Sequence, residues 1–341
     1  IAHLVGLQAQ EPLDPYTGLW SRLEGFDPHD LGTRLEDRTL VRLVTLRGTV
    51  HLHTAADALV VRALVQDLMT RRISPGNMFG RALAGLDLDA ILADVWAWIG
   101  AEPRTGAEVK ARLADAGSAD LDRLVDAVKY ALPHVQVPPR GVWGKKGQAR
   151  WAPLDQWLGR PVPEPGPAEE DALILRYLAA FGPASAADIT TWSGWTGVRA
   201  KLDRLSDRLV RYRHEDTNRE LVDVPDGLRP DADVLAPVRF LPEFDNVVLS
   251  HADRSRIVPP DLGSNHVLGL DPRPRVVLVD GMVGGLWRID HGDDRARLVL
   301  RPMVRWTKDQ TRDARAEGAA LLRLHAPDAD HDVEVADQPA R

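Results

Sequence analysis

The sequence predicts an α+β protein made of three tandem winged-helix units followed by a C-terminal β-rich domain. The pattern of residues 172–224 predicts three short helices and then two strands joined by a polar turn, which is the element order of a winged helix. A similar pattern of helix, strand and turn signals recurs at residues 86–153 and, more weakly, at residues 1–55. After about residue 230 the pattern changes to short strands separated by turns.

Size and composition are those of a multidomain globular protein. The 341 residues exceed what one compact domain usually holds, and 44% hydrophobic with 27% charged residues is ordinary for a folded chain. We expect a first winged-helix unit with a connecting helix, a second unit, a linker with the third unit, and the β-rich domain. Their expected bounds are 1–85, 86–160, 161–230 and 231–341.

The first unit is expected to contain helices at residues 1–10, 16–23 and 37–44. Residues 48–53 predict a strand that enters a hairpin, and residues 59–70 predict a connecting helix.

The second unit should begin with a helix at residues 88–99, and Thr105 with Glu108 predicts a capping box for the next helix. A third helix is expected at 121–132, with strands at 135–138 and 149–152. The stretch between these strands is Gly-rich and basic, as a wing that touches DNA would be.

The third unit follows a Pro-rich stretch, 161–167, that predicts a stiff linker. A helix at 172–181 should stop at Gly182-Pro183, and Ser185 and Thr196 are expected to cap the next two helices. The last of these is expected to run over 197–209, with strands at 209–214 and 219–224.

The C-terminal domain is expected to be built from strands, with one late helix at 307–322. Asp280-Gly281 predicts a two-residue hairpin turn. The expected strands are 234–240, 247–249, 276–279, 282–288 and 297–302.

Cysteine is absent, which excludes disulfides, thiolate catalysis and cysteine-based zinc or iron–sulfur sites. No apolar run is long enough to span a membrane, and no signal peptide is apparent in a chain that starts at Ile1. We therefore expect a cytoplasmic protein that does not contact membranes.

Four short motifs carry the strongest functional signal. They are Leu-Gln-Ala-Gln-Glu at 7–11, Arg-Gly-Thr-Val-His-Leu at 47–52, Leu-Pro-Glu-Phe-Asp-Asn at 241–246 and Ser-His-Ala-Asp-Arg at 250–254. A Gln-x-Gln pair alone carries almost no information, because glutamine is common on helix surfaces. In this order and spacing, however, the set resembles the winged-helix DNA glycosylases of the AlkZ and YcaQ type, over essentially the whole chain.

The resemblance implies hydrolysis of the N-glycosidic bond of a damaged base, with Gln8 and Gln10 as the catalytic pair. The transition state of such a reaction places positive charge on the sugar. A glutamine is no strong base, but its amide oxygen can accept a hydrogen bond from the attacking water and its amino group can donate one. This weaker arrangement suits a leaving group that is already good, such as an N7-alkylated purine, including one held in an interstrand crosslink.

Other residues compete for roles at the site. Glu11 could be the true base, although it precedes Pro12 at a helix-breaking position. His51 and His53 share one face of a strand and could contact a phosphate or the target nucleotide. They could also bind a metal, although no third ligand is obvious, or they could simply pack in a domain contact.

The segment 241–256 is dense in polar residues for a turn between strands. Asp245, Asn246 and His251 could line the active-site cleft. The alternative is that these polar side chains only cap turns.

The net charge of −7 argues mildly against nucleic acid as a partner, but the distribution of charge matters more than its sum. Basic residues gather on the expected second wing and third helix, where they could neutralise phosphates without reading sequence. For each of them the alternative is an ordinary solvated surface. The expected DNA contacts are Arg47, Arg140, Lys145, Lys146, Arg199, Lys201 and Arg204.

The function expected is that of a monomeric, cofactor-free DNA glycosylase acting on double-stranded DNA, in repair or in self-resistance to an alkylating toxin. No lysine lies near Gln8 and Gln10 in sequence, so we expect hydrolysis without a Schiff-base lyase step. A winged-helix transcriptional regulator is the alternative, because winged helices alone do not define function. A third possibility is a protein that sequesters a genotoxic small molecule in a Trp-rich cleft, since the chain has ten tryptophans.

Overall fold

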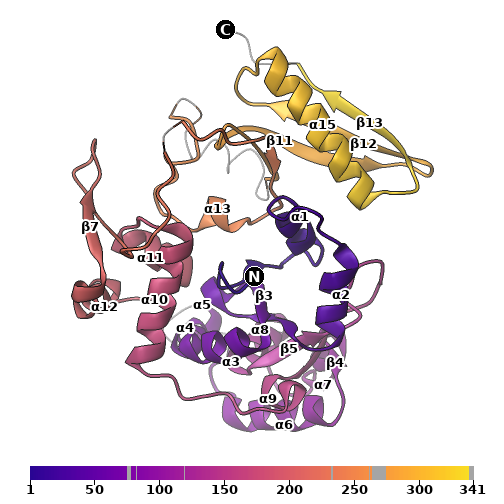
Figure 1. Ribbon diagram of the computed structural model, residues 1–341. Coiled ribbons are helices and arrows are strands. Elements are labelled where there is room, and N and C mark those ends of the chain that lie inside the picture. Colours follow the sequence, from indigo (N-terminus) through magenta and orange to yellow (C-terminus); the bar gives the residue numbers. More distant parts are fainter. Residues whose placement is uncertain are drawn as a thin grey trace. The chain divides into compact units, whose positions relative to one another are not determined.

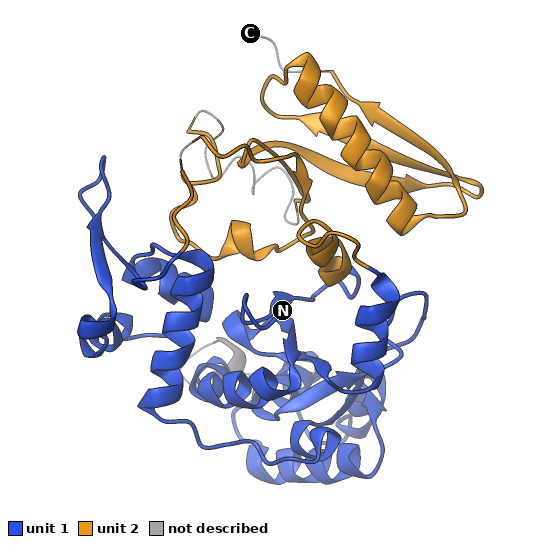
Figure 2. Ribbon diagram, in the orientation of Figure 1, with its two compact units in different colours: residues 1–13, 27–227 blue, residues 14–26, 228–341 orange. Residues whose placement is uncertain are grey.

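The structure is a computed structural model that describes residues 1–74, 78–81, 83–118, 120–231, 233–260, 262 and 274–337. The chain divides into two compact units, shown in separate colours in Figure 2. The first comprises residues 1–13 and 27–227, and the second comprises residues 14–26 and 228–341. None of the helices in the described part of the chain has the length and apolar character needed to span a bilayer.

A six-stranded sheet lies at the centre of the first unit, in the order β1-β3-β2-β5-β6-β4 (Figure 1). The expected first and second winged-helix units therefore share one sheet, because β2 and β5 pair directly and antiparallel. The strands are β1 (Leu7–Gln8), β2 (Leu40–Val44), β3 (Val50–Thr54), β4 (Arg104–Thr105), β5 (His134–Val137) and β6 (Arg150–Pro153).

One face of this sheet packs against helix α3, where apolar strand residues such as Leu43 and Val135 meet Ala58 and Leu59. Thr54 caps α3, and the predicted capping box of Thr105 and Glu108 is confirmed at the start of α7. The elements around the sheet are α2 (Pro28–Glu36), the 3-10 turn η1 (Leu46–Gly48), α3 (Ala55–Leu64), α4 (Gln66–Arg72), α5 (Met78–Arg81), α6 (Leu88–Ala101), α7 (Gly106–Arg112), α8 (Leu121–Ala131) and α9 (Leu154–Leu158).

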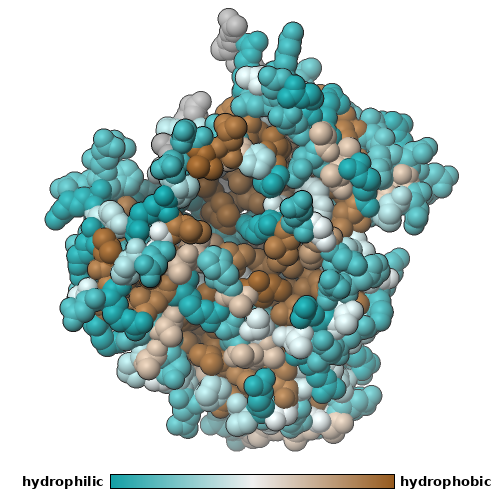
Figure 3. Space-filling model, viewed as in Figure 1, coloured by the Kyte–Doolittle hydropathy of each residue, from teal (hydrophilic) through white to brown (hydrophobic). Residues whose placement is uncertain are grey.

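Residues 167–223 have the expected order of three helices and a hairpin. Ser185 caps the second helix as predicted, and Tyr177 packs against Trp192 between the first two helices, with tilted rings whose centroids are 4.8 Å apart. Hydrophilic side chains cover the hairpin on the face shown in Figure 3. The elements are α10 (Pro167–Phe181), α11 (Ala186–Ser193), α12 (Val198–Arg204), the 3-10 turn η2 (Ser206–Arg208), β7 (Val210–Arg213) and β8 (Glu220–Asp223).

The second unit is a five-stranded sheet in the order β13-β12-β11-β10-β9, covered by the long helix α15 (Figure 1). Its core is apolar and includes Phe240, Trp287 and Leu321, with Trp20 of α1 packed against it. The elements are α1 (Asp14–Trp20), β9 (Arg239–Phe240), α13 (Asn246–Leu249), β10 (Val276–Val279), β11 (Met282–His291), β12 (Arg295–Pro302), α15 (Lys308–His325) and β13 (Asp330–Val335).

Several expected elements are wrong. Residues 1–10 and 37–44 do not form helices; they supply the strands β1 and β2, because short apolar runs do not distinguish a buried strand from a helix. Residues 247–249 lie in α13 instead of a strand, since the side chain of Asp245 caps that turn. The third helix of the 167–223 segment ends at Arg204, and its N-cap is Gly197 rather than Thr196.

Candidate active site

Gln8 lies on the two-residue strand β1, which pairs antiparallel with β3. The register sets Gln8 opposite His51, so the two side chains share a face of the sheet. The backbone N–H of Ala9 extends the pairing by donating to Val50 O at 2.8 Å. Only 8% of Gln8 is exposed, so its amide group functions within the protein interior.

The partner of Gln8 is Arg47, which lies half-buried in the tight turn between β2 and β3. Arg47 has the left-handed φ of 56°, and the following Gly48 has a φ of 72°. The Arg47 guanidinium donates to Gln8 Oε1 at 2.8 Å and to the carbonyl oxygen of Trp192 at 2.7 Å. Burial lowers the pKa of Arg47 to about 10, so it remains charged at neutral pH. Arg47, an expected DNA contact, is thus a half-buried cation that links β1 to helix α11.

His51 and His53 are both buried and neutral. The Nδ1 of His51 lies 3.0 Å from Thr49 O, which makes it the donor and leaves Nε2 to accept from Arg47 at 3.3 Å. Burial and the charge of Arg47 hold the pKa of His51 well below its usual value. Burial lowers the pKa of His53 to about 4, and its Nε2 lies 2.9 Å from Thr45 Oγ1.

These contacts favour the packing role for the two histidines over a metal role. Their rings are stacked, with centroids 5.7 Å apart and an angle of 28° between the ring planes. Across the described ranges, no group of three or more histidine and carboxylate side chains could hold a metal ion.

Gln10 lies in different surroundings, at the point where β1 has ended. It is exposed and lines a cavity of about 350 Å³ together with Val50 of β3, Arg42 of β2 and Gln136 of β5. Val50 precedes His51 along β3, so the two residues face opposite sides of the sheet. The two glutamines of the motif are therefore separated: Gln8 faces Arg47 and Gln10 faces the cavity.

Arg42 joins the cavity to the strand that carries the glutamines. It is 2% exposed, and its guanidinium donates to Ala9 O at 2.8 Å and to Arg140 O at 3.4 Å. Gly141, with a φ of 88°, packs so closely that a Cβ there would lie 2.9 Å from Arg42 Cδ. Arg42 thus fixes the backbone immediately before Gln10.

Sequence analysis missed Arg42, Lys129 and Gln136 as site residues. The one local signal was an arginine inside the apolar run of residues 40–44, and it was obscured because that run was taken for a helix. Lys129 lies on α8 and Gln136 on β5, far from Gln10 in sequence, so only the tertiary structure brings them to the cavity.

The basic residues expected to contact DNA are not equivalent. Arg140 lines the Gln10 cavity, and Lys146 is exposed. Lys145 forms an ion pair with Glu36, and Lys201 forms one with Glu170. Arg204 is bonded to Asp171 at 2.6 Å. Lys145, Lys201 and Arg204 are therefore already paired with carboxylates of the chain.

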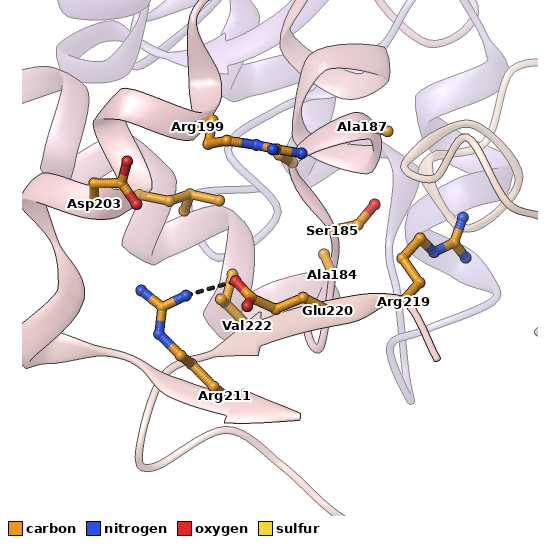
Figure 4. Close-up of a pocket in the computed structure, with 11 residues that line it drawn as sticks. Ala184, Ser185, Ala187, Arg199, Asp203, Arg211, Arg219, Glu220 and Val222 are labelled. Carbon is orange, nitrogen blue, oxygen red and sulfur yellow. Dashed lines mark hydrogen bonds and ion pairs between the residues drawn. The ribbon is translucent and has the colours of Figure 1, made fainter. Parts of the chain in front are cut away.

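Arg199 lines a second cavity, of about 450 Å³, in the segment of α11, α12 and the β7–β8 hairpin (Figure 4). Arg211 and Arg219 also line it, but Arg211 forms an ion pair with Glu220 at 2.5 Å, and Asp203 is a further lining residue. This cavity is therefore of mixed charge.

The polar segment 241–256 belongs to the second unit, where several of its side chains have partners within that unit. Asp245 forms a two-bond ion pair with Arg22, at 2.6 and 2.9 Å, and accepts from Val247 N to cap α13. Asn246 is buried at the start of α13, and Arg256 donates to the Nε2 of His251. These contacts match the turn-capping alternative for Asp245.

Comparison with known proteins identifies the family. The model of the family "DNA glycosylase AlkZ-like" matches residues 1–324. The chain is also similar in structure to the Streptomyces sahachiroi DNA glycosylase AlkZ, with a TM-score of 0.78 and 19% sequence identity over 98% of this chain and 92% of that one. No curated protein sequence matches it. Because the family model covers nearly the whole chain, this protein belongs to the AlkZ-like family of DNA glycosylases.

Proposed function

We propose that this glycosylase hydrolyses the N-glycosidic bond of N7-alkylated purines in duplex DNA, including purines joined in interstrand crosslinks. The observation that carries the proposal is the position of Gln10. Its amide is exposed in the wall of a cavity lined by cations, at the end of a strand that Arg42 and Arg47 fix from opposite faces of the sheet.

The chemistry follows from what an amide can do. The Gln10 side chain accepts a hydrogen bond from a water through its oxygen and donates through its nitrogen, which orients the water without deprotonating it fully. Such weak activation is sufficient only when the leaving base is already cationic, as an N7-alkylated purine is. The same site would leave normal bases intact, because their departure needs stronger acid or base assistance.

Gln8 supports this arrangement from the buried side. Its amide oxygen accepts a hydrogen bond from Arg47, which ties β1 to the turn between β2 and β3. We propose that Gln8 and Gln10 act as a pair, with Gln10 holding the water and Gln8 fixing the strand that leads to Gln10.

The mode of access is part of the proposal. Glycosylases ordinarily extrude the target base into a pocket. A purine tied covalently to the opposite strand cannot leave the duplex freely, so the amide of Gln10 must approach the sugar with the base still in place. An exposed Gln10 is compatible with such an approach.

Release of N7-methylguanine from duplex DNA tests the proposal directly. Wild type is compared with Gln8→Ala, Gln10→Ala and the double variant, and DNA binding by each is measured in parallel. We expect release by wild type and its loss in the Gln10 variants while binding persists. Binding without release from either monoadduct or crosslinked duplex would overturn the proposed substrate.

A further inference from the structure

The cavity beside Gln10 is lined by an unusual set of side chains. Three are cationic, and three others are the amides of Gln10, Gln136 and Gln148. Thr105 adds a hydroxyl, and no carboxylate occurs among the described residues of the lining. The cations are Arg42, Lys129 and Arg140.

Several separate elements converge to build this lining. Arg42 comes from β2, and Gln136 is its cross-strand partner on β5. Lys129 comes from α8, and Arg140 with Gln148 comes from the segment between β5 and β6. The convergence is a property of the fold of the first unit, and no run of basic sequence produces it.

Glu108 is a carboxylate that contacts a lining residue of the cavity, Thr105, and it is held at the start of α7. Glu108 accepts from the backbone N–H and the hydroxyl of Thr105 at 2.7 and 2.8 Å, and lies 3.6 Å from Arg150. In the second cavity, by contrast, Asp203 and Glu220 are part of the lining. The lining of the Gln10 cavity therefore has the greater excess of positive charge of the two, which favours an anionic ligand.

We propose that this cavity binds one backbone phosphate of the DNA strand that carries the damaged purine, next to the target nucleotide. The phosphates on either side of a nucleotide are only a few bonds from its anomeric carbon, so a phosphate held here would bring that carbon to Gln10. Arg42 contacts the cavity and Ala9 O at once, which couples phosphate binding to the backbone that positions Gln10.

Charge balance gives an independent argument for the same ligand. Hydrolysis develops positive charge on the sugar, and the three cations that line the cavity beside Gln10 would oppose it. A bound phosphate neutralises part of that charge and supplies negative potential where the sugar becomes cationic. The phosphate site rests on the proposed function in one respect only, namely which nucleotide is the target.

The test is a methylphosphonate scan, in which one phosphate at a time is made neutral in a duplex carrying a tetrahydrofuran abasic analogue. The analogue has no base to release, so the readout is binding and does not depend on catalysis. The variant Lys129→Gln/Arg140→Gln removes two cations at half-buried positions. The matched control is Arg160→Gln/Lys308→Gln, which removes two exposed cations outside the cavity.

We expect one methylphosphonate position beside the abasic analogue to weaken binding by wild type and by the control about 10-fold, since a charge-assisted contact is lost. A methylphosphonate at that position should not weaken DNA binding by the Lys129→Gln/Arg140→Gln variant. The slope of log Kd against log salt should fall by about 1 in this variant and remain unchanged in the control.

An equal response of the variant and wild type at every methylphosphonate position would overturn the phosphate site. So would an unchanged salt slope. If wild type failed to release N7-methylguanine, the proposed substrate would fail, but the binding scan would still decide the phosphate inference.

Discussion

The guanidinium of Arg47 donates a 2.8 Å hydrogen bond to the amide oxygen of Gln8. The relationship exists because β1 adds to the edge of the sheet next to β3, which places Gln8 over the turn that carries Arg47. The same guanidinium holds the last turn of α11 through Trp192 O. One arginine thus ties the first motif of the chain to the segment 167–223.

Replacement of Arg47 by lysine should lower both stability and base release. A single ammonium cannot reproduce the fork that contacts Gln8 Oε1 and Trp192 O together, and the backbone strain at this position is the same for both residues. We expect the unfolding free energy to fall by about 1–3 kcal/mol. In a double-mutant cycle, Gln8→Ala should cost less activity in Arg47→Lys than in wild type. If the activity losses of Gln8→Ala and Arg47→Lys were fully additive in the double variant, Arg47 would not act through Gln8.

Replacement of Gln10 by glutamate should preserve base release and introduce a pH dependence. A carboxylate accepts the water's hydrogen bond and stabilises a cationic sugar, but only while it is ionised. The rate of N7-methylguanine release by Gln10→Glu should therefore fall at low pH more steeply than that of wild type. Gln10→Leu, of similar size, should lose most of the activity, and because Gln10 is exposed, both variants should unfold within about 0.5 kcal/mol of wild type. Full activity in Gln10→Leu would exclude a role for the amide.

Protonation of His53 should destabilise the fold as pH falls. Burial lowers its pKa from 6.5 to about 4, so between these values the unfolded chain binds the proton and the folded chain does not. Stability then rises with pH across this window, by about 3 kcal/mol for this one group. His53→Gln should be less stable than wild type at pH 7.5, and the difference should narrow toward pH 5 in denaturant titrations. If the unfolding free energies of wild type and His53→Gln changed in parallel between pH 7.5 and pH 5, His53 would not be held neutral in the folded protein.

Loss of the Arg22–Asp245 ion pair should destabilise the second unit. Arg22→Met leaves the Asp245 side chain, which is 1% exposed, without its cation, at a cost of about 3–5 kcal/mol. The double variant Arg22→Met/Asp245→Asn should recover part of that loss, because no unpaired charge remains. Base release per folded molecule should change little in Asp245→Asn if Asp245 is structural. A large loss of rate at unchanged stability would restore Asp245 to the active site.

No covalent enzyme–DNA adduct should form. Sequence proximity had suggested that no lysine approaches the glutamines, yet Lys129 lines the Gln10 cavity and so needs a direct test. We expect no product from borohydride trapping with wild type, because we propose that Lys129 acts as a cation toward a phosphate. A trapped adduct that disappears in Lys129→Gln would establish a Schiff-base step instead. EDTA should leave base release unchanged.

Local signals in the sequence were sufficient at several positions where the interacting groups are close together in the chain. The caps at Thr105 and Ser185 and the turn at Asp280-Gly281 form as predicted, because a capping side chain and its target are only three residues apart. The strand β13 was missed, since its acidic side chains suggest a solvated tail. It is held instead by pairing with β12 and by ion pairs such as Arg295–Asp332 at 2.8 Å.

The family was identifiable from the sequence alone, because short motifs in fixed order distinguish a family even when their geometry is unknown. The Gln-x-Gln pair, which the same motifs single out, stays a prediction. What the pair faces was decided only by tertiary structure. Strand pairing directs Gln8 to Arg47 and leaves Gln10 in a cavity whose cations come from β2, α8 and the segment after β5. Long-range strand register, which no local pattern specifies, determines both environments.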